Sequence, residues 1–566
     1  MNNINKKASK VSWSKSGKPW IFLNAGALSI SLVMVFGLLV LIGYNGLSYF
    51  WPSDVISADY SVPGKKSVKI LGEIHSTEEV PALRLKESKV KITVPKDVYQ
   101  RHLIKSSHSL GESPYHSYLD IFLKNKSEPK NIAVIERRTG GNFYGYIIGL
   151  KQNGKTLQVT AGTRNASVDN AIKRSSTLHQ RMVNIKKKDI GTTNYEKGRL
   201  FRYKKKLKWQ LEKHKISDSY YQKELAATAK ANKILDDKYS ILIKKLEGLT
   251  QKINRDQLLV KDHKGITHEL KVSNVILYYH ANQLGLFGKT GVFFTKLWEF
   301  LSDEPRESIE GGIFPAIFGT VVMVILMSIL VTPLGVIAAI YLHEYAKQGA
   351  MTRIIRISVN NLAGVPSIVY GVFGLGFFVY FLGSSIDAIF YPELVRDKIT
   401  TFGTPALIWA SLTLALLTLP VVIVATEEGL SRVPRSMREG SLALGATRAE
   451  TLWRTILPMA SPGIITGLIL AIARAAGEVA PLMLVGVVKI SPTAPIDLNA
   501  PFIHFDRTIM HLGFHIYDVG FQSPNSVASK PLVFATAFIL VLVIVLLNLT
   551  AISIRNKLRE RYKSIE

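Results

Sequence analysis

The chain has 566 residues and a formal net charge of +29, because 71 Lys and Arg outnumber 42 Asp and Glu. The absence of cysteine excludes disulfides, thiolate metal sites and a cysteine nucleophile. Such basicity can indicate nucleic-acid binding, but the sequence carries no RRM, zinc-finger or basic-zipper pattern. Cationic loops beside anionic headgroups are the better interpretation, so we expect membrane lipid and no nucleic acid as a partner.

Six apolar runs reach the roughly 20 residues that a helix needs to cross a membrane. The first, Ile21–Ile42, ends in aromatic residues up to position 51 and lacks the small-residue cleavage site of a signal peptide. We therefore interpret 21–51 as a retained first span with its interface. The other five runs form a predicted five-helix core at 313–554: Ile313–Leu342, Ile357–Leu382, Thr404–Thr426, Ala460–Val487 and Pro531–Ile554.

Lysine and arginine in the short connections set the expected orientation. They gather in the tail 1–20, in the loops 343–356 and 427–459, and in the tail 555–566. Six crossings place these four segments on one side, which the positive-inside rule makes the cytoplasm. The sequence thus predicts a multi-pass protein of the bacterial inner membrane with both termini cytoplasmic and segment 52–312 outside.

The segment 52–312 is predicted to be a large extracytoplasmic α+β insert in an otherwise α-helical polytopic membrane protein. Its Asn-Gly and Lys-Gly pairs are typical of turns between antiparallel strands. Nothing in the insert indicates a ligand. The predicted strands are Val68–Ile74, Val90–Val94, Ile132–Glu136, Leu157–Thr163, Leu258–Lys261 and Glu269–Val275, with a hairpin of Tyr144–Leu150 and Thr156–Val159 that overlaps the fourth of these.

A charged stretch at about 195–256 predicts a helical hairpin inside the insert. Leucines and alanines recur at three- and four-residue spacing from Leu225 to Leu249, and Asn232 interrupts this stripe. The stripe could form a partner-binding coiled coil in which the asparagine fixes the register. Packing against a preceding helix at about 196–214 is the favoured interpretation.

Two motifs that would indicate a nucleotide-binding site and a zinc-protease site are incomplete in this chain. Gln283–Thr290 is close to a phosphate-binding P-loop, but Gln283 stands where the first glycine belongs. His343 and Glu344 open a zinc-protease pattern, but Lys347 replaces its second histidine. We therefore expect no catalytic residue, no metal and no cofactor bound by the chain.

The loop 427–458 carries the strongest local signal. It resembles the EAA loop of ABC importer permeases, with Gly440 and Ser441 in place of two alanines. The resemblance implies a coupling loop that docks on a separate ATP-hydrolysing subunit; an ordinary amphipathic helix is the alternative. The residues that carry the resemblance are Glu439, Gly440, Ser441, Gly445, Leu457 and Pro458.

Two charged residues lie within the predicted span Ala460–Val487. Arg474 and Glu478 are four residues apart, which predicts one helix face. A charge at the centre of a span costs at least about 2.5–3.5 kcal/mol, so it is kept where it pairs or lines a pathway. The pair could be purely structural. The functional interpretation is that Arg474 meets a permeating oxyanion and that Glu478 orients it.

Three stretches together resemble the PstA-type phosphate permeases of ABC importers: Asn361–Gly371 with Phe373-Gly374, the loop Glu439–Pro458, and Arg474–Pro481. The resemblance covers about 313–555 and the first span, but not the insert. It implies an ABC importer permease fold and half of a translocation pore. The implied partners are a second permease subunit in a heterodimer, an ATP-binding subunit dimer that uses the ATP, and an extracytoplasmic phosphate-binding protein.

Two alternatives stay open from the residues alone. Arg474 would serve sulfate, molybdate or a phosphonate as well as phosphate, because all are oxyanions. A membrane receptor or regulatory subunit that acts through the insert belongs to a different class, and the coupling loop speaks against it.

Overall fold

The computed structural model describes residues 18–63, 66–87, 97–107, 114–160, 162, 164–306, 311–523 and 526–563. The tail before Lys18 and the predicted strand Val90–Val94 lie outside these residues. Within them, six helices are long and apolar enough to cross a membrane, which confirms the predicted polytopic class. They are Pro19–Ser48, Phe314–Tyr345, Ser367–Phe390, Leu407–Ser431, Arg448–Gly477 and Val527–Lys557.

Two of the predicted spans were wrong at their ends. The run from Ile357 combines the end of an amphipathic helix, α8 (Ala350–Leu362), with a new span that starts at Ser367. Pro366 separates them, because the residue before a proline is biased away from helix. The span expected to reach Val487 stops at Gly477, and the chain continues in extended backbone.

The five-helix core forms around α12 (Leu407–Ser431), which lies between α7 (Phe314–Ile340) and α15 (Leu457–Gly477). Glycines permit the close approach: a Cβ at Gly335 would lie 2.6 Å from the Val422 side chain, and one at Gly463 would lie 2.7 Å from Gly429 Cα. The remaining core helices and turns are α9 (Ser367–Phe373), η7 (Gly374–Gly383), α10 (Ser384–Phe390), α11 (Pro392–Arg396), α16 (Leu482–Val485), α17 (Leu512–Tyr517), η9 (Asp518–Gln522) and α18 (Ser526–Lys563).

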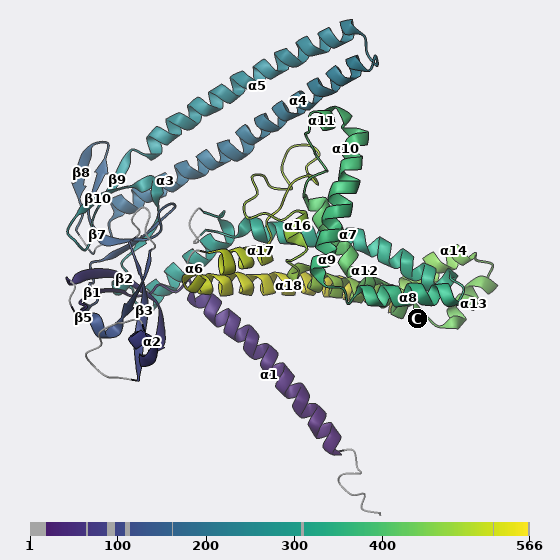
Figure 1. The fold of residues 1–566 in the computed structure, drawn as a ribbon, viewed down its shortest axis with the longest axis horizontal. Coiled ribbons are helices and arrows are strands. Elements are labelled where there is room, and N and C mark those ends of the chain that lie inside the picture. Colours follow the sequence, from purple (N-terminus) through teal and green to yellow (C-terminus); the bar gives the residue numbers. More distant parts are fainter. Residues whose placement is uncertain are drawn as a thin grey trace, which may run out of the picture.

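The first span, α1 (Lys18–Ser48), stands apart from the other five (Figure 1). It touches α18 near its own end, where a Cβ at Gly46 would lie 2.8 Å from the Phe534 carbonyl oxygen. Most of its apolar side chains are exposed in the chain alone. We call the face of the core beside the end of α1 and the insert the insert side.

The β part of the insert consists of two antiparallel sheets, with the strand orders β4-β3-β2-β1-β5 and β10-β9-β7-β6-β11, and with β8 paired to β7. The Asn153-Gly154 turn joins β7 and β8, as predicted. The strand expected to run to Val275 ends at Lys271. The strands are β1 (Val55–Tyr60), β2 (Val68–Pro81), β3 (Val98–Ser106), β4 (Tyr115–Leu119), β5 (Leu123–Ser127), β6 (Ala133–Arg137), β7 (Phe143–Gln152), β8 (Lys155–Gln158), β9 (Asp256–Lys261), β10 (Thr267–Lys271) and β11 (Val275–Tyr279).

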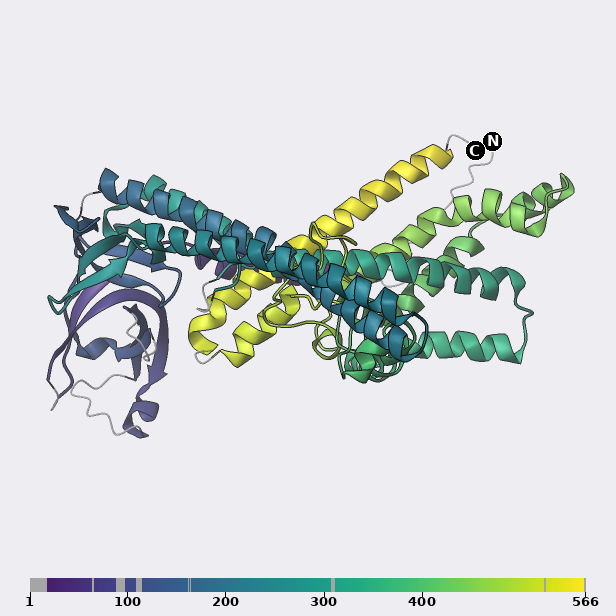
Figure 2. The same ribbon diagram turned by 90° about the horizontal axis from the view of Figure 1, so that it is seen from above.

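The helical hairpin is longer than predicted. Its first arm begins far before residue 195: α3 (Ala166–Asn184), capped by the Asn165 side chain, continues through a π turn at Ile185–Ile190 into α4 (Gly191–Glu212). Its second arm, α5 (Asp218–Ile253), packs against α4. Figures 1 and 2 show both arms running from the sheets across the insert side of the core.

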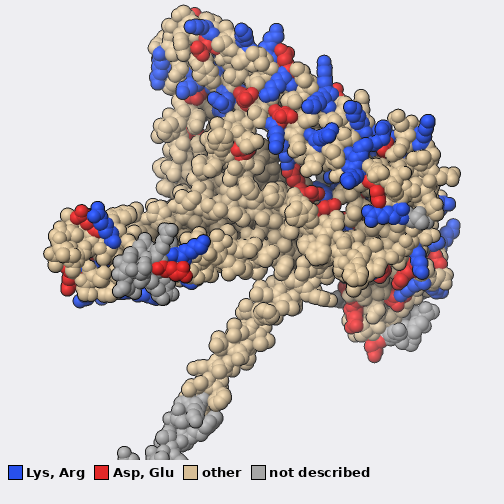
Figure 3. Space-filling view, turned by 180° about the vertical axis from the view of Figure 1, so that it is seen from behind, with Lys and Arg blue, Asp and Glu red and all other residues tan. Residues whose placement is uncertain are grey.

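The first arm of the hairpin contacts the core through polar side chains spread along α4, from Tyr195 to Glu212. Lys205 Nζ lies 2.5 Å from Asp397 Oδ2, and Arg396 of α11 pairs with Glu212. The Tyr195 hydroxyl donates to the Ala500 carbonyl oxygen at 2.6 Å. The hydrogen bond from Lys205 lowers the pKa of Asp397. Figure 3 shows Lys and Arg gathered on the hairpin, the β sheets and the far end of the core, with an uncharged surface between.

Candidate functional site

The predicted pair Arg474 and Glu478 lies where α15 ends. Glu478 has extended backbone (φ −79°, ψ 130°), so it does not share a helix face with Arg474 as predicted. The two side chains still meet, with Arg474 Nε 3.7 Å from Glu478 Oε1. Arg474 Nε has no hydrogen bond among the described residues, and 36% of the side chain is exposed. The carboxylate therefore neutralises this guanidinium only in part.

The broken segment after Gly477 is enclosed by two other spans. A Cβ at Gly371 of α9 would lie 2.6 Å from Pro481 Cα, so glycine is required for this approach. Tyr370, the residue before it, donates its hydroxyl to the Leu362 carbonyl oxygen at 2.6 Å. Two of the sequence stretches that carried the family resemblance are therefore neighbours in space.

The predicted coupling loop is a helix–turn–helix at the end of the core opposite the insert side. It contains α13 (Arg435–Ala443), α14 (Arg448–Thr451) and a π turn at Leu452–Ile456 that leads into α15. Gly445 forms the turn with φ +89°, a conformation that favours glycine. Leu457 and Pro458 start α15, where a missing N–H is tolerated.

The outer surface of this loop is free of contacts within the chain. Glu439 and Gly440 are exposed, and a Cβ at Gly440 would meet no atom within 4 Å. Leu444 is 91% exposed and Trp453 is 67% exposed. Ser441 faces inward instead, with its Oγ 2.9 Å from Thr451 Oγ1. An exposed apolar surface of this kind is typical of a contact with a partner protein or with the membrane.

Sequence reasoning missed the contacts that hold the loop to the core. Arg438 Nη2 donates to Glu344 Oε1 at 3.0 Å and to the Leu430 carbonyl oxygen at 2.9 Å. Glu344 was considered only as part of a failed zinc motif. A capping box was also missed, in which Thr447 and Glu450 exchange hydrogen bonds at the start of α14. Its Thr-x-x-Glu spacing was a readable signal.

The two groups of candidate residues are far apart. Leu457 and Arg474 lie on one helix, and its rise of about 1.5 Å per residue separates them by about 25 Å. The helix α15 is therefore one direct connection between the loop and the arginine. Among the described residues, no group of three or more His, Asp or Glu side chains could hold a metal ion.

Comparison with known proteins identifies relatives of the core. Residues 331–563 match the family model of binding-protein-dependent transport system inner membrane components. The phosphate transport system permease protein PstA 1 of Mycobacterium tuberculosis is 34% identical over 249 residues, which cover 44% of this chain and 72% of that protein. PstA of Mycobacterium leprae is 39% identical over 181 residues, which cover 32% of this chain and 53% of that protein.

Solved ABC transporters align with the same fraction of the chain. A chain of the methionine transporter MetNI in an inward-facing conformation is 17% identical, with coverage of 47% of this chain and 98% of that chain and a TM-score of 0.31. A bacterial alginate transporter bound to its periplasmic protein is 13% identical, with 48% and 83% coverage and a TM-score of 0.31.

Proposed function

Because the chain belongs to the family of binding-protein-dependent transport system inner membrane components, as a PstA-type permease, we propose that it imports inorganic phosphate. It forms half of the translocation pore, with a second permease subunit as the other half. ATP is hydrolysed on a separate subunit dimer, and an extracytoplasmic binding protein delivers the phosphate. The chain itself binds no cofactor.

The orientation is part of this proposal. The loop at 427–458 must meet a cytoplasmic ATPase, which places it and both termini in the cytoplasm. The insert side then faces outward, where the binding protein arrives. The arginine-rich connections on the loop side agree with this orientation.

Arg474 is the residue that we propose to meet the anion. The single observation that carries this role is its incomplete neutralisation, since Glu478 lies 3.7 Å away and no hydrogen bond satisfies Nε among the described residues. A guanidinium offers paired donors to tetrahedral oxyanions. Glu478 holds the side chain at the end of α15 while no phosphate is bound.

The exposed face of the coupling loop is proposed to dock in a cleft of the ATPase. Gly440 leaves room for the partner, and Leu444 supplies an apolar contact. The ion pair between Arg438 and Glu344 fixes the loop to the π turn Tyr341–Tyr345 that follows α7, so a movement of the ATPase passes into the core. The loop transmits force and makes no covalent bond.

The decisive experiment is radiolabelled phosphate uptake in cells that lack other phosphate transporters and express the chain with both partner subunits and the binding protein. We expect ATP-dependent uptake that falls about ten- to hundredfold in Arg474→Ala, the effect of losing charged hydrogen bonds worth about 1.5–3 kcal/mol. Arg474→Lys, which keeps the charge but not the paired donors, should recover only part.

Co-purification of the ATPase controls for assembly. Normal uptake in an assembled Arg474→Ala complex would leave only a structural role for the pair. Transport of sulfate or molybdate in place of phosphate would keep the permease and change the substrate.

A further inference from the structure

The helix α6 (Leu286–Ser302) connects the β sheets to the core and has one face that nothing in the chain covers. Phe287 is 92% exposed, Phe294 is 65% exposed and Trp298 is 71% exposed. Their spacing of seven and four residues places these three rings on one side of the helix. The other exposed positions on that side are Gly291, Thr295 and Ser302, so the face carries no charge.

The opposite face of α6 is packed against the membrane core. Phe293 and Phe300 belong to a cluster with Phe50 at the end of α1 and Ile313 at the start of α7. The Phe293 ring lies 6.4 Å from the Phe50 ring and 6.1 Å from the Trp51 ring, measured between centroids. The helix therefore lies at the level where one span ends and another begins.

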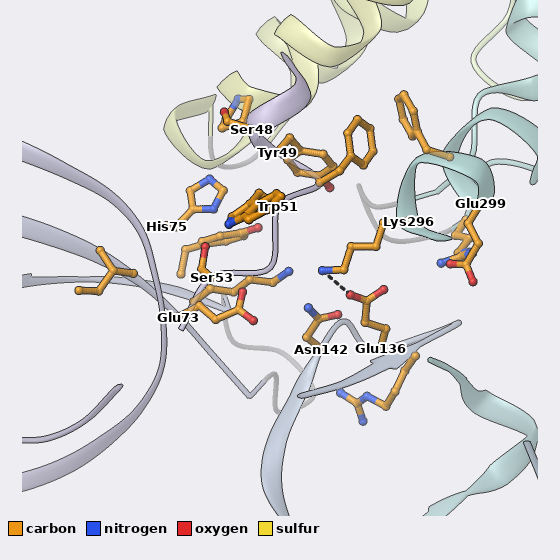
Figure 4. A pocket seen from close by; sticks show the side chains of 18 of the residues that line it. Ser48, Tyr49, Trp51, Ser53, Glu73, His75, Glu136, Asn142, Lys296 and Glu299 are labelled. Carbon is orange, nitrogen blue, oxygen red and sulfur yellow. Dashed lines mark ion pairs between the residues drawn. The ribbon is translucent and has the colours of Figure 1, made fainter. Parts of the chain in front are cut away.

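The polar residues of α6 point toward the β sheets. Lys289 Nζ lies 2.9 Å from Asp54 Oδ1, and Lys296 Nζ lies 2.7 Å from Glu136 Oε1. Figure 4 shows Lys296 and Glu299 reaching into a cavity of about 160 Å³ between α6, the end of α1 and the sheets. The helix thus has a core face, a sheet face and a bare aromatic face.

We infer that the aromatic face of α6 binds the lipid surface on the insert side, with the helix lying in the interfacial zone of the bilayer. Aromatic rings prefer that zone, where one end of the ring is apolar and the other is wet. The contact of α6 with the ends of two spans places it at this depth. Lipid contact therefore fixes the distance of the β sheets from the membrane, because the Lys289–Asp54 and Lys296–Glu136 ion pairs join α6 to the sheets.

The absence of cysteine from the chain permits a direct test. A spin label at Phe294→Cys is measured in the assembled complex in phospholipid nanodiscs. Collisions with oxygen report lipid, and collisions with a water-soluble nickel chelate report solvent. Lys223→Cys, at an exposed position of α5, is the water control, and a spin-labelled phospholipid in the same discs is the lipid reference.

For lipid contact we expect oxygen accessibility near the lipid reference and a loss of the nickel collisions that the Lys223→Cys label shows. Trp298→Cys should repeat the result, which guards against a local effect of one substitution. Nickel accessibility equal to the water control would overturn the inference. Low accessibility to both reagents would also overturn it, because a partner subunit would then cover the face. Neither result depends on which anion is transported.

Discussion

The core and the insert are held by different contacts. In the core, α7, α12 and α15 approach one another at glycines, where side chains of neighbouring helices fill the space of a missing Cβ. The first arm of the hairpin meets the same core through Lys205, Glu212 and Tyr195, whose partners are polar groups of the core. Close packing is costly to disturb, whereas exposed ion pairs contribute little and separate easily.

This difference separates a core that matches a transport family model from a large insert that lies before the match. The family model covers residues 331–563, which begin after the insert. At its base the insert joins the core through the apolar side chains of α6, which pack against the end of α1 and the start of α7. Four changes test how far this division holds.

The largest difference in phosphate uptake should come from replacing an exposed glycine with tryptophan, once in the core and once in the insert. Gly440 in α13 and Gly198 in α4 both have open space where a Cβ would lie. Gly440→Trp should abolish phosphate uptake without loss of the folded chain, because the indole blocks the face that we propose for the ATPase. Gly198→Trp should leave uptake unchanged. Equal loss in both variants would mean that bulk alone, and not docking, is responsible.

A smaller effect is expected inside the core. Gly371→Val forces a side chain into Pro481, and such overpacking costs about 1–3 kcal/mol of unfolding free energy. Gly376→Val, on the same span with no atom within 4 Å, is the matched control. Thermal unfolding of the purified chain in detergent measures both. Equal stability of the two variants would show that the broken segment can move away from α9.

The stability of the junction between the insert and the core should depend on pH. Burial and the nearby Glu136 raise the pKa of Glu299 from 4.5 to about 7, with Arg306, Arg138 and Asp303 also close. The folded protein therefore binds this proton more tightly than the unfolded chain, and stability falls as pH rises from about 4.5 to 7. Glu299→Gln should remove that fall in the unfolding midpoint. An unchanged pH profile would assign it to other groups.

The smallest change in stability is expected at the hairpin tip. Lys205→Ala with Arg396→Ala removes two exposed ion pairs, each worth about 0.2–1 kcal/mol. The distance distribution between spin labels at Lys213→Cys and Lys398→Cys should nevertheless broaden. A narrow, unchanged distribution would show that the Tyr195 contact suffices to hold the tip.

The membrane core was largely predictable because spans leave long apolar runs, and both charged candidates were found by their depth. What failed depended on backbone geometry: Glu478 was assigned to a helix that ends one residue earlier, at Gly477. Composition alone does not reveal that the helix ends at Gly477, because residues 479–487 remain apolar on both sides of Pro481. The close approach at this break, between Gly371 and Pro481, joins residues more than a hundred positions apart.

The insert was predictable only in its local pieces. The Asn153-Gly154 turn and the second arm of the hairpin follow from short-range patterns. The first arm was placed too late, because lysines from 186 to 188 and the polar residues before them hide its helical continuity. Its contacts with Asp397 and Ala500 depend on tertiary structure that no local pattern encodes. Neither the hairpin's position over the core nor the role of α6 could be derived from sequence.

The first arm of the hairpin is one long helix, because the π turn at Ile185–Ile190 joins α3 to α4 without a break. Ile185 is buried at the base, and the helix from there to Lys205 is about 30 Å long at 1.5 Å per residue. The Lys205–Asp397 pair separates from 2.5 Å to beyond ion-pair distance, about 4 Å, when the tip is displaced by roughly 1.5 Å. At this radius the displacement corresponds to a rotation of about three degrees. A tilt of the β sheets by this angle would therefore break the Lys205–Asp397 contact between the arm and the core.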